Sequence, residues 1–229
     1  FSGSITNTLF PEMSRLSSEE EPNAVSGLVE TSLTYGGLFL IPGLFGGSLL
    51  GERILLLYGP EFPEGTTVLV VLIIANLMQG YQQQLLSTLS GIDRPDLAFR
   101  VNGAFVVANL LLNVVLVYLY GWLGAAVATA ISAGISYVLS YFYVRSIVDF
   151  SFPRAEIAYQ VGASIIMGCV VYGGIRFGEG FVLLQSNIVL VMTLIMVGAS
   201  VYFGTLLVLS TEFRETVARN LPLDSLGSF

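Results

Sequence analysis

The residues best suited to chemistry in this chain are asparagines and glutamines that recur at helical spacing inside apolar segments. One segment carries Asn102, Asn109 and Asn113, whose intervals place them on a single helical face. The preceding segment carries a second row of amides and hydroxyls: Asn76, Gln79, Gln83, Ser87 and Ser90. Such faces point at other helices or at a hydrated cavity, because lipid does not accept them.

These polar rows allow two interpretations. The side chains could hydrogen-bond between helices, which contributes about 0.6 kcal/mol per contact. They could instead line a polar cavity for a sugar-bearing substrate. A third row with the same spacing favours an interior that is at least partly hydrated, and its members are Thr129, Ser132, Ser136 and Ser140. The candidate cavity residues are Asn76, Gln83, Asn109 and Asn113.

Two further residues suggest function in the first apolar segment. Arg53 is its cation and adjoins Glu52. A guanidinium group matches phosphate oxygens, so Arg53 is a further cavity candidate; alternatively, it extends to the outer surface with Glu52 as its local partner. Pro42 stands among glycines and removes a backbone hydrogen bond, which predicts a kink. That kink suits a gating helix, and a static packing kink is the alternative.

Composition excludes several kinds of site. The chain has no histidine and one cysteine, Cys169, so it contains no histidine-based triad, histidine-ligated metal or intrachain disulfide. A membrane glycosyltransferase needs acidic residues with a sizeable loop, and Asp93, Asp96 and Asp149 stand in short connections. We therefore expect no enzyme, no cofactor and no metal.

The elements that must position these residues are membrane helices. Apolar residues make up 54% of the 229 and charged residues 11%, against roughly 25% charged in a soluble domain. A helix needs about 20 apolar residues to cross a bilayer. Six segments qualify: 27–58, 66–90, 99–120, 124–144, 156–177 and 184–209. The predicted fold class is all-α, a polytopic membrane bundle. Residues 1–26 are expected to end a preceding helix and form a cytoplasmic loop, and residues 210–229 to form a cytoplasmic tail.

Arginine placement orients this bundle. With six spans, one side receives all but two of the nine arginines: Arg15, Arg94, Arg100, Arg145, Arg154, Arg214 and Arg219. Arg176 falls on the other side and Arg53 within the first span. The positive-inside rule then places both ends of the segment in the cytoplasm. The net charge of −7 with no lysine excludes a basic nucleic-acid footprint and suggests adaptation to high salt.

Four motifs in order resemble those of a known family. Residues 9–16 resemble the helix end "FPxxS" of polysaccharide flippases, and residues 54–62 resemble the exit "hydrophobic run, (F/Y)G, x, x, F". Residues 109–113 are similar to the "N-x-x-x-N" span, and residues 120–129 to the "(Y)G-x-x-G-A-A-x-A-T" after it. The chain thus resembles the C-terminal half of O-antigen-type and archaeal oligosaccharide flippases in the multidrug/oligosaccharidyl-lipid/polysaccharide exporter superfamily.

This resemblance implies a two-lobed transporter of fourteen spans, of which this chain would supply the last six. It implies movement of a polyprenyl- or dolichyl-linked saccharide across the cytoplasmic membrane by alternating access, with the substrate between the lobes. The implied partners are the lipid-linked saccharide, membrane lipids and the N-terminal half of the same transporter. The chain starts in mid-protein on this interpretation. The family's cation-lined cavity is not evident, since Arg53 is the sole intramembrane cation.

Three alternatives stay open at this point. A multidrug exporter relative would be expected to keep acidic residues in mid-span, and the four later spans have none. A membrane-embedded glycosyltransferase would need larger loops. A non-transporting scaffold is compatible with the same pattern.

Overall fold

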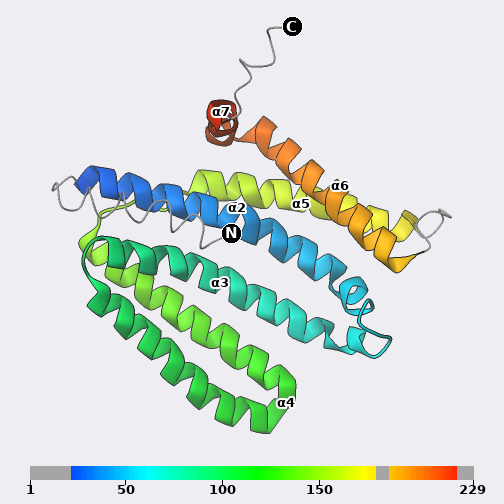
Figure 1. The fold of residues 1–229 in the computed structure, drawn as a ribbon, viewed down its shortest axis with the longest axis horizontal. Coiled ribbons are helices and arrows are strands. Elements are labelled where there is room, and N and C mark those ends of the chain that lie inside the picture. The colour runs from blue at the N-terminus through cyan, green and yellow to red at the C-terminus, as the bar shows by residue number, and fades with distance from the viewer. Residues whose placement is uncertain (1–21, 179–185, 221–229) are drawn as a thin grey trace, which may run out of the picture.

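The computed structural model describes residues 22–178 and 186–220, and this part of the chain is helical, as predicted (Figure 1). The elements are α2 (Pro22–Leu55), a short 3-10 helix η1 (Phe62–Gly65), α3 (Thr66–Gly91), α4 (Pro95–Ile147), α5 (Arg154–Gly178), α6 (Asn187–Leu209) and α7 (Thr211–Asn220). The "FPxxS" motif and Arg15 lie outside the described residues, as do the tail from residue 221 and the first residues of the sixth predicted span.

Helix α4 is a hairpin of two antiparallel arms (Figure 1). Its backbone leaves helical geometry at Gly121, where φ is 60° and ψ is −137°. A side chain would strain that conformation, so glycine is required there. Among residues 22–178 and 186–220, five helices are long and apolar enough to cross a membrane when α4 is taken as one. Because Gly121 divides α4, the bundle contains the six membrane-length helices that the sequence predicted.

A second glycine brings the arms of this hairpin together. A Cβ at Gly124 would overlap the backbone carbonyl of Leu116 in the opposite arm. Ala126 and Ala128 follow on the same arm and are buried. The Gly-x-x-Gly-Ala-Ala sequence therefore encodes a tight turn and a closely packed arm, which is the usual role of small residues in membrane helices.

Helix α2 is the shared support of the bundle. It packs against α3 and against α5, so that the group α3–α4 and the group α5–α6 both contact it (Figure 1). Its first half contributes Val29 and Leu33 to a core with α3 and α4. Its second half contributes Leu38 and Leu50 to a core with α5 and α6. Movement of either group against the other must therefore involve α2.

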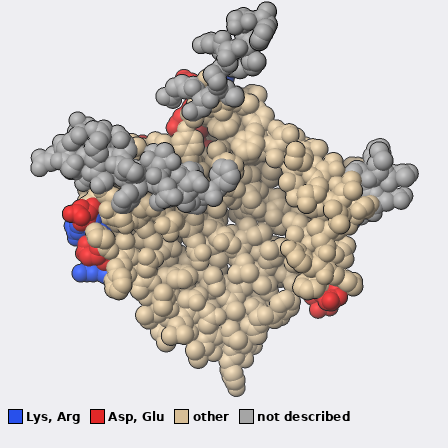
Figure 2. Space-filling model, in the orientation of Figure 1, with Lys and Arg blue, Asp and Glu red and all other residues tan. Residues whose placement is uncertain are grey.

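The surface has the layout that a bilayer requires. On the face shown in Figure 2 the charged side chains lie at the edges, and the broad middle carries none. At the Gly121 end, Tyr118, Tyr120 and Trp122 are exposed, and the ring of Trp122 lies against Gly65 of η1. Tyrosine and tryptophan collect at membrane–water interfaces, so this end is suited to one membrane surface.

The connection between α4 and α5 is attached to the start of α2. The Ser151 amide donates to Glu30 Oε1 at 2.7 Å, and the Ser26 hydroxyl donates to the Asp149 carbonyl at 2.9 Å. Arg145 pairs with the Asp149 carboxylate at 2.9 Å. Glu30 therefore has a structural partner at the bundle end opposite Gly121.

The hairpin geometry yields a first prediction. G124A should lower the thermal unfolding midpoint of the detergent-solubilised protein, because a methyl group there overlaps the Leu116 carbonyl. The matched control is G103A, in the other arm, where a Cβ meets nothing within 4 Å. That change should be neutral or slightly stabilising, since alanine favours a helix over glycine by about 1 kcal/mol. Equal midpoints for the two variants would contradict this account of the turn.

Candidate functional site

The four predicted cavity amides lie on two helices that pack together. Asn76 and Gln83 are exposed on α3, and Asn109 and Asn113 are half-buried on the first arm of α4. Asn76 Nδ2 donates to the Leu72 carbonyl at 3.0 Å. Asn113 Nδ2 donates to the Asn109 carbonyl at 2.8 Å and to its Oδ1 at 3.0 Å. Within the described residues these bonds stay inside one helix, so the structure does not join the α3 pair to the α4 pair.

The two glutamines on either side of Gln83 in α3 face into the bundle. Gln82 and Gln84 are buried, and Gln84 Cγ would lie 3.3 Å from a Cβ at Gly36 of α2. Gln83 between them is exposed. The packed face of α3 therefore contains Gln84, and Gln83 is available to a group outside this bundle.

The third polar row packs tightly instead of lining a hydrated space. Ser132, Ser136 and Ser140 are fully buried. Their hydroxyls donate to carbonyls three or four residues earlier in the same helix, at 2.7 to 3.1 Å. Serine can satisfy itself in this way inside a helix. The burial of these three serines favours packing over a hydrated space at their positions. Spacing alone does not distinguish a self-bonded serine from a cavity-lining one.

Arg53 occupies the last turn of α2, near the η1 end of the bundle. Its backbone carbonyl accepts a 2.8 Å hydrogen bond from Asn187 Nδ2 at the start of α6. The final carbonyls of a helix lack partners within the helix, so Asn187 caps α2 from a neighbouring element. A cation in the last turn also interacts favourably with the helix dipole. Arg53 is thus at a helix end and not at mid-depth.

Helix α2 continues through Pro42, and a residue of another helix replaces the backbone hydrogen bond that the proline removes. Proline has no N–H, so the carbonyl four residues earlier, that of Leu38, loses its helical partner. The Tyr202 hydroxyl of α6 donates to this carbonyl at 2.9 Å, and Tyr202 is buried. Sequence reasoning did not identify this donor. The available signals were the position four before a proline and the single tyrosine of α6.

An apolar cleft of about 290 Å³ adjoins this proline. Helix α2 contributes Pro42 and three glycines, Gly43, Gly46 and Gly47, to its wall, together with the side chains of Phe39, Leu50 and Ile54. Apolar side chains of α5 and α6 complete it, and the three glycines leave space that side chains would otherwise fill. Room beside a helix break allows α2 to bend without displacing packed atoms.

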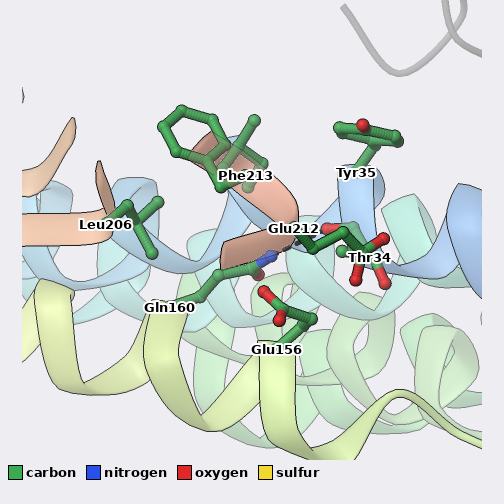
Figure 3. A pocket seen from close by; sticks show the side chains of 8 residues that line it. Thr34, Tyr35, Glu156, Gln160, Leu206, Glu212 and Phe213 are labelled. Atoms are coloured by element: carbon green, nitrogen blue, oxygen red, sulfur yellow. Dashed lines mark hydrogen bonds between the residues drawn. The ribbon is translucent and has the colours of Figure 1, made fainter. Parts of the chain in front are cut away.

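At the Glu30 end of the bundle, α7 lies across the other helices and closes a cavity of about 10 Å³ (Figure 3). Gln160 Nε2 of α5 donates to the Thr34 carbonyl of α2 at 2.9 Å. The Ser210 hydroxyl, directly before α7, donates to Glu156 Oε2 at 2.6 Å. Glu212 of α7 also lines the cavity. Burial, and then the carboxylates of Glu156, Glu215 and Glu30, raise the pKa of Glu212 above its ordinary value.

Two curated relatives match nearly the whole chain, whereas no protein-family model matches it. Both are from Haloferax volcanii. The probable low-salt glycan biosynthesis flippase Agl15 is 31% identical over 227 residues, which is 96% of this chain and 46% of that protein. The probable flippase AglR is 31% identical over 226 residues, 97% of this chain and 46% of that protein. The chain therefore spans about half the length of the curated relatives it matches, in their C-terminal half.

A solved structure with the same fold is the lipid II flippase MurJ in an inward closed conformation. The TM-score is 0.75 with 18% sequence identity, over 95% of this chain and 44% of that one. This similarity establishes the fold, a bundle of membrane helices.

The Pro42 repair gives a second prediction, measured as a thermodynamic cycle in the detergent-solubilised protein. Y202F should lower stability by about 0.6 to 1.7 kcal/mol, the range for interhelical hydrogen bonds in membrane proteins. P42A returns an N–H to the Leu38 carbonyl, so Y202F should cost less in the P42A background. Denaturant unfolding of the two single variants and the double variant measures the coupling. Equal costs in both backgrounds would show that the bond does not compensate for the proline.

A third prediction concerns pH and α7. Glu212 in the docked helix binds a proton more readily than an ordinary glutamate, whose pKa is 4.5. Docking is therefore favoured at low pH and weakens as pH rises through the raised pKa. A spin label at Ala218, which is exposed on α7, should become more mobile across that interval.

E212Q should remove this pH dependence, and E64Q in η1, at the other end of the bundle, should keep it. A label mobility that does not change with pH in the unsubstituted protein would contradict the role of Glu212.

Proposed function

We propose that this chain, which belongs to the flippase family of its archaeal relatives, forms one lobe of a transporter that moves a lipid-linked oligosaccharide across the membrane by alternating access. The observation that carries this proposal is 31% identity to two flippases over nearly the whole chain. A fold shared with a lipid II flippase supports it. The relatives are transporters, so the chain is assigned no catalytic residue, cofactor or metal.

The other lobe would be the N-terminal half of the same transporter. Relatives about twice as long as this chain support that assignment. The substrate would lie between the lobes, and one lobe alone would not complete a passage. The carrier lipid is proposed to be polyprenyl or dolichyl, because six long apolar helices offer their surface to membrane lipids and acyl-like chains.

Amide side chains on α3 and α4 would form this lobe's part of the saccharide site. Asn76 and Gln83 are exposed on a helix whose opposite face is packed. Amides donate and accept hydrogen bonds, as sugar hydroxyls do. Asn109 and Asn113 on the adjacent helix extend the polar surface, and Arg53 could pair with the carrier phosphate at the η1 end.

The motion would centre on α2. Pro42, the glycines after it and the cleft beside them provide a bendable segment between the two helix groups. Arg94, Arg145 and Arg154 lie at the bundle end opposite Gly121, which we propose faces the cytoplasm of the cell membrane with both ends of this segment.

The test of this function uses the full-length transporter, reconstituted in vesicles with a fluorescent lipid-linked oligosaccharide. Replacing Asn76 and Gln83 with alanine should lower the flipping rate roughly thirtyfold, since each of the two lost hydrogen bonds contributes about 1 kcal/mol. The pair N109A and N113A should lower it similarly. S200A is the control, because that exposed hydroxyl on α6 bonds to its own helix. Unchanged flipping in both amide variants would disprove the site, and no flipping by the unsubstituted protein would disprove the function.

A further inference from the structure

Two buried polar atoms without a hydrogen-bond partner among the described residues lie beside Gly37 of α2. The Tyr81 hydroxyl comes from α3 and Gln160 Oε1 from α5. Neither atom has a hydrogen-bond partner within the described part of the chain. Tyr81 is 9% exposed and Gln160 2% exposed, so water does not substitute freely. A buried donor and a buried acceptor that both lack partners are uncommon in native proteins and require an explanation.

Glycine at position 37 allows the two groups to approach each other. A Cβ there would overlap both the Tyr81 hydroxyl and Gln160 Oε1. Both atoms therefore border the volume of one absent methyl group. A small shift of the tyrosine would let its hydroxyl donate to the amide oxygen. Any larger residue at position 37 would occupy that space and keep the groups apart.

Other buried hydroxyls in the bundle behave differently. Ser32, Thr88 and Ser132 donate to carbonyls of their own helices. The Tyr202 hydroxyl donates to the Leu38 carbonyl. Among the described residues, Tyr81 shares its unpaired state with one other buried hydroxyl, that of Ser164 in α5, one turn after Gln160.

The pair also bridges the two halves of the bundle. Tyr81 belongs to the α3–α4 group, where its ring packs near Tyr137 at 6.3 Å. Gln160 belongs to the α5–α6 group and is held to α2 by its 2.9 Å bond to the Thr34 carbonyl. Gly37 lies between these groups, little more than one turn before Pro42. A bend of α2 at the proline would change the separation of the two polar atoms.

We infer that Tyr81 and Gln160 form a hydrogen-bond latch across α2 at Gly37, open in this structure and closed in another conformation of the transport cycle. Closing it joins the α3–α4 group to the α5–α6 group through one bond from the tyrosine hydroxyl to the amide oxygen. The latch rests on the proposed alternating-access function. Its two members are positioning residues, which select a conformation and do not contact substrate.

The experiment measures conformation without substrate. Spin labels are placed at Ser146 of α4 and Ala218 of α7, both exposed, in full-length protein whose Cys169 is replaced by serine. Electron–electron distance measurements in nanodiscs report the ratio of two conformers. Y81F should shift this ratio about threefold, which corresponds to one interhelical hydrogen bond of about 0.6 kcal/mol. Y137F removes a neighbouring tyrosine hydroxyl and should leave the ratio unchanged.

Coupling between the two residues decides the proposal. In a Q160M background the acceptor is absent, so Y81F should have no further effect on the ratio. Q160N shortens the side chain by one methylene and so moves the amide oxygen away from Tyr81. It replaces Q160M in the experiment if Q160M does not fold. A Y81F shift that is the same in all backgrounds, or absent in all, would overturn the latch. If the vesicle assay shows no flipping while the coupling is present, the proposed function fails and the latch stands.

Discussion

The structure depends on one constraint, that a carbonyl left without a partner inside lipid must find one from another helix. Pro42 creates such a carbonyl at Leu38, and the hydroxyl of Tyr202 satisfies it from α6 at 2.9 Å. The packing of α6 against α2 therefore stabilises α2 at the position where proline removes a backbone hydrogen bond. This bond joins α2, next to Pro42 and its cleft, to the α5–α6 group.

The same constraint sorts the polar side chains of the bundle. Hydroxyls such as that of Ser136 bond to their own helix and are buried between packed helices. Asn187 and Tyr202 bond to backbone carbonyls of α2 and hold separate helices together. Asn76, which bonds to its own helix, and Gln83 differ from both groups because they are exposed on the surface of the bundle. Their exposure is the reason that they are proposed to contact a saccharide.

In the proposed mechanism, the position of Pro42 lets this chain contribute motion as well as a binding surface. Helix α2 contacts both helix groups, so a bend near Pro42 changes their relative position without breaking either core. Helix α7 lies beside Thr34 and Tyr35 within α2, Glu156 near the start of α5 and Leu206 near the end of α6. A movement of this part of α2 would therefore change its contacts with α7. The chain belongs to the flippase family of its archaeal relatives and shares its fold with MurJ.

The sequence by itself determined the class, the six helices and the family, because each depends on local properties. Apolar length selects membrane helices, and Gly121 with Gly124 encodes a turn whose geometry few other residues permit. Tertiary structure alone decided the partners of Leu38, Arg53 and Gln160, since each partner comes from another helix far along the chain. It also decided that Ser132 is packed and Gln83 exposed, because helical periodicity defines a face and packing determines what that face meets.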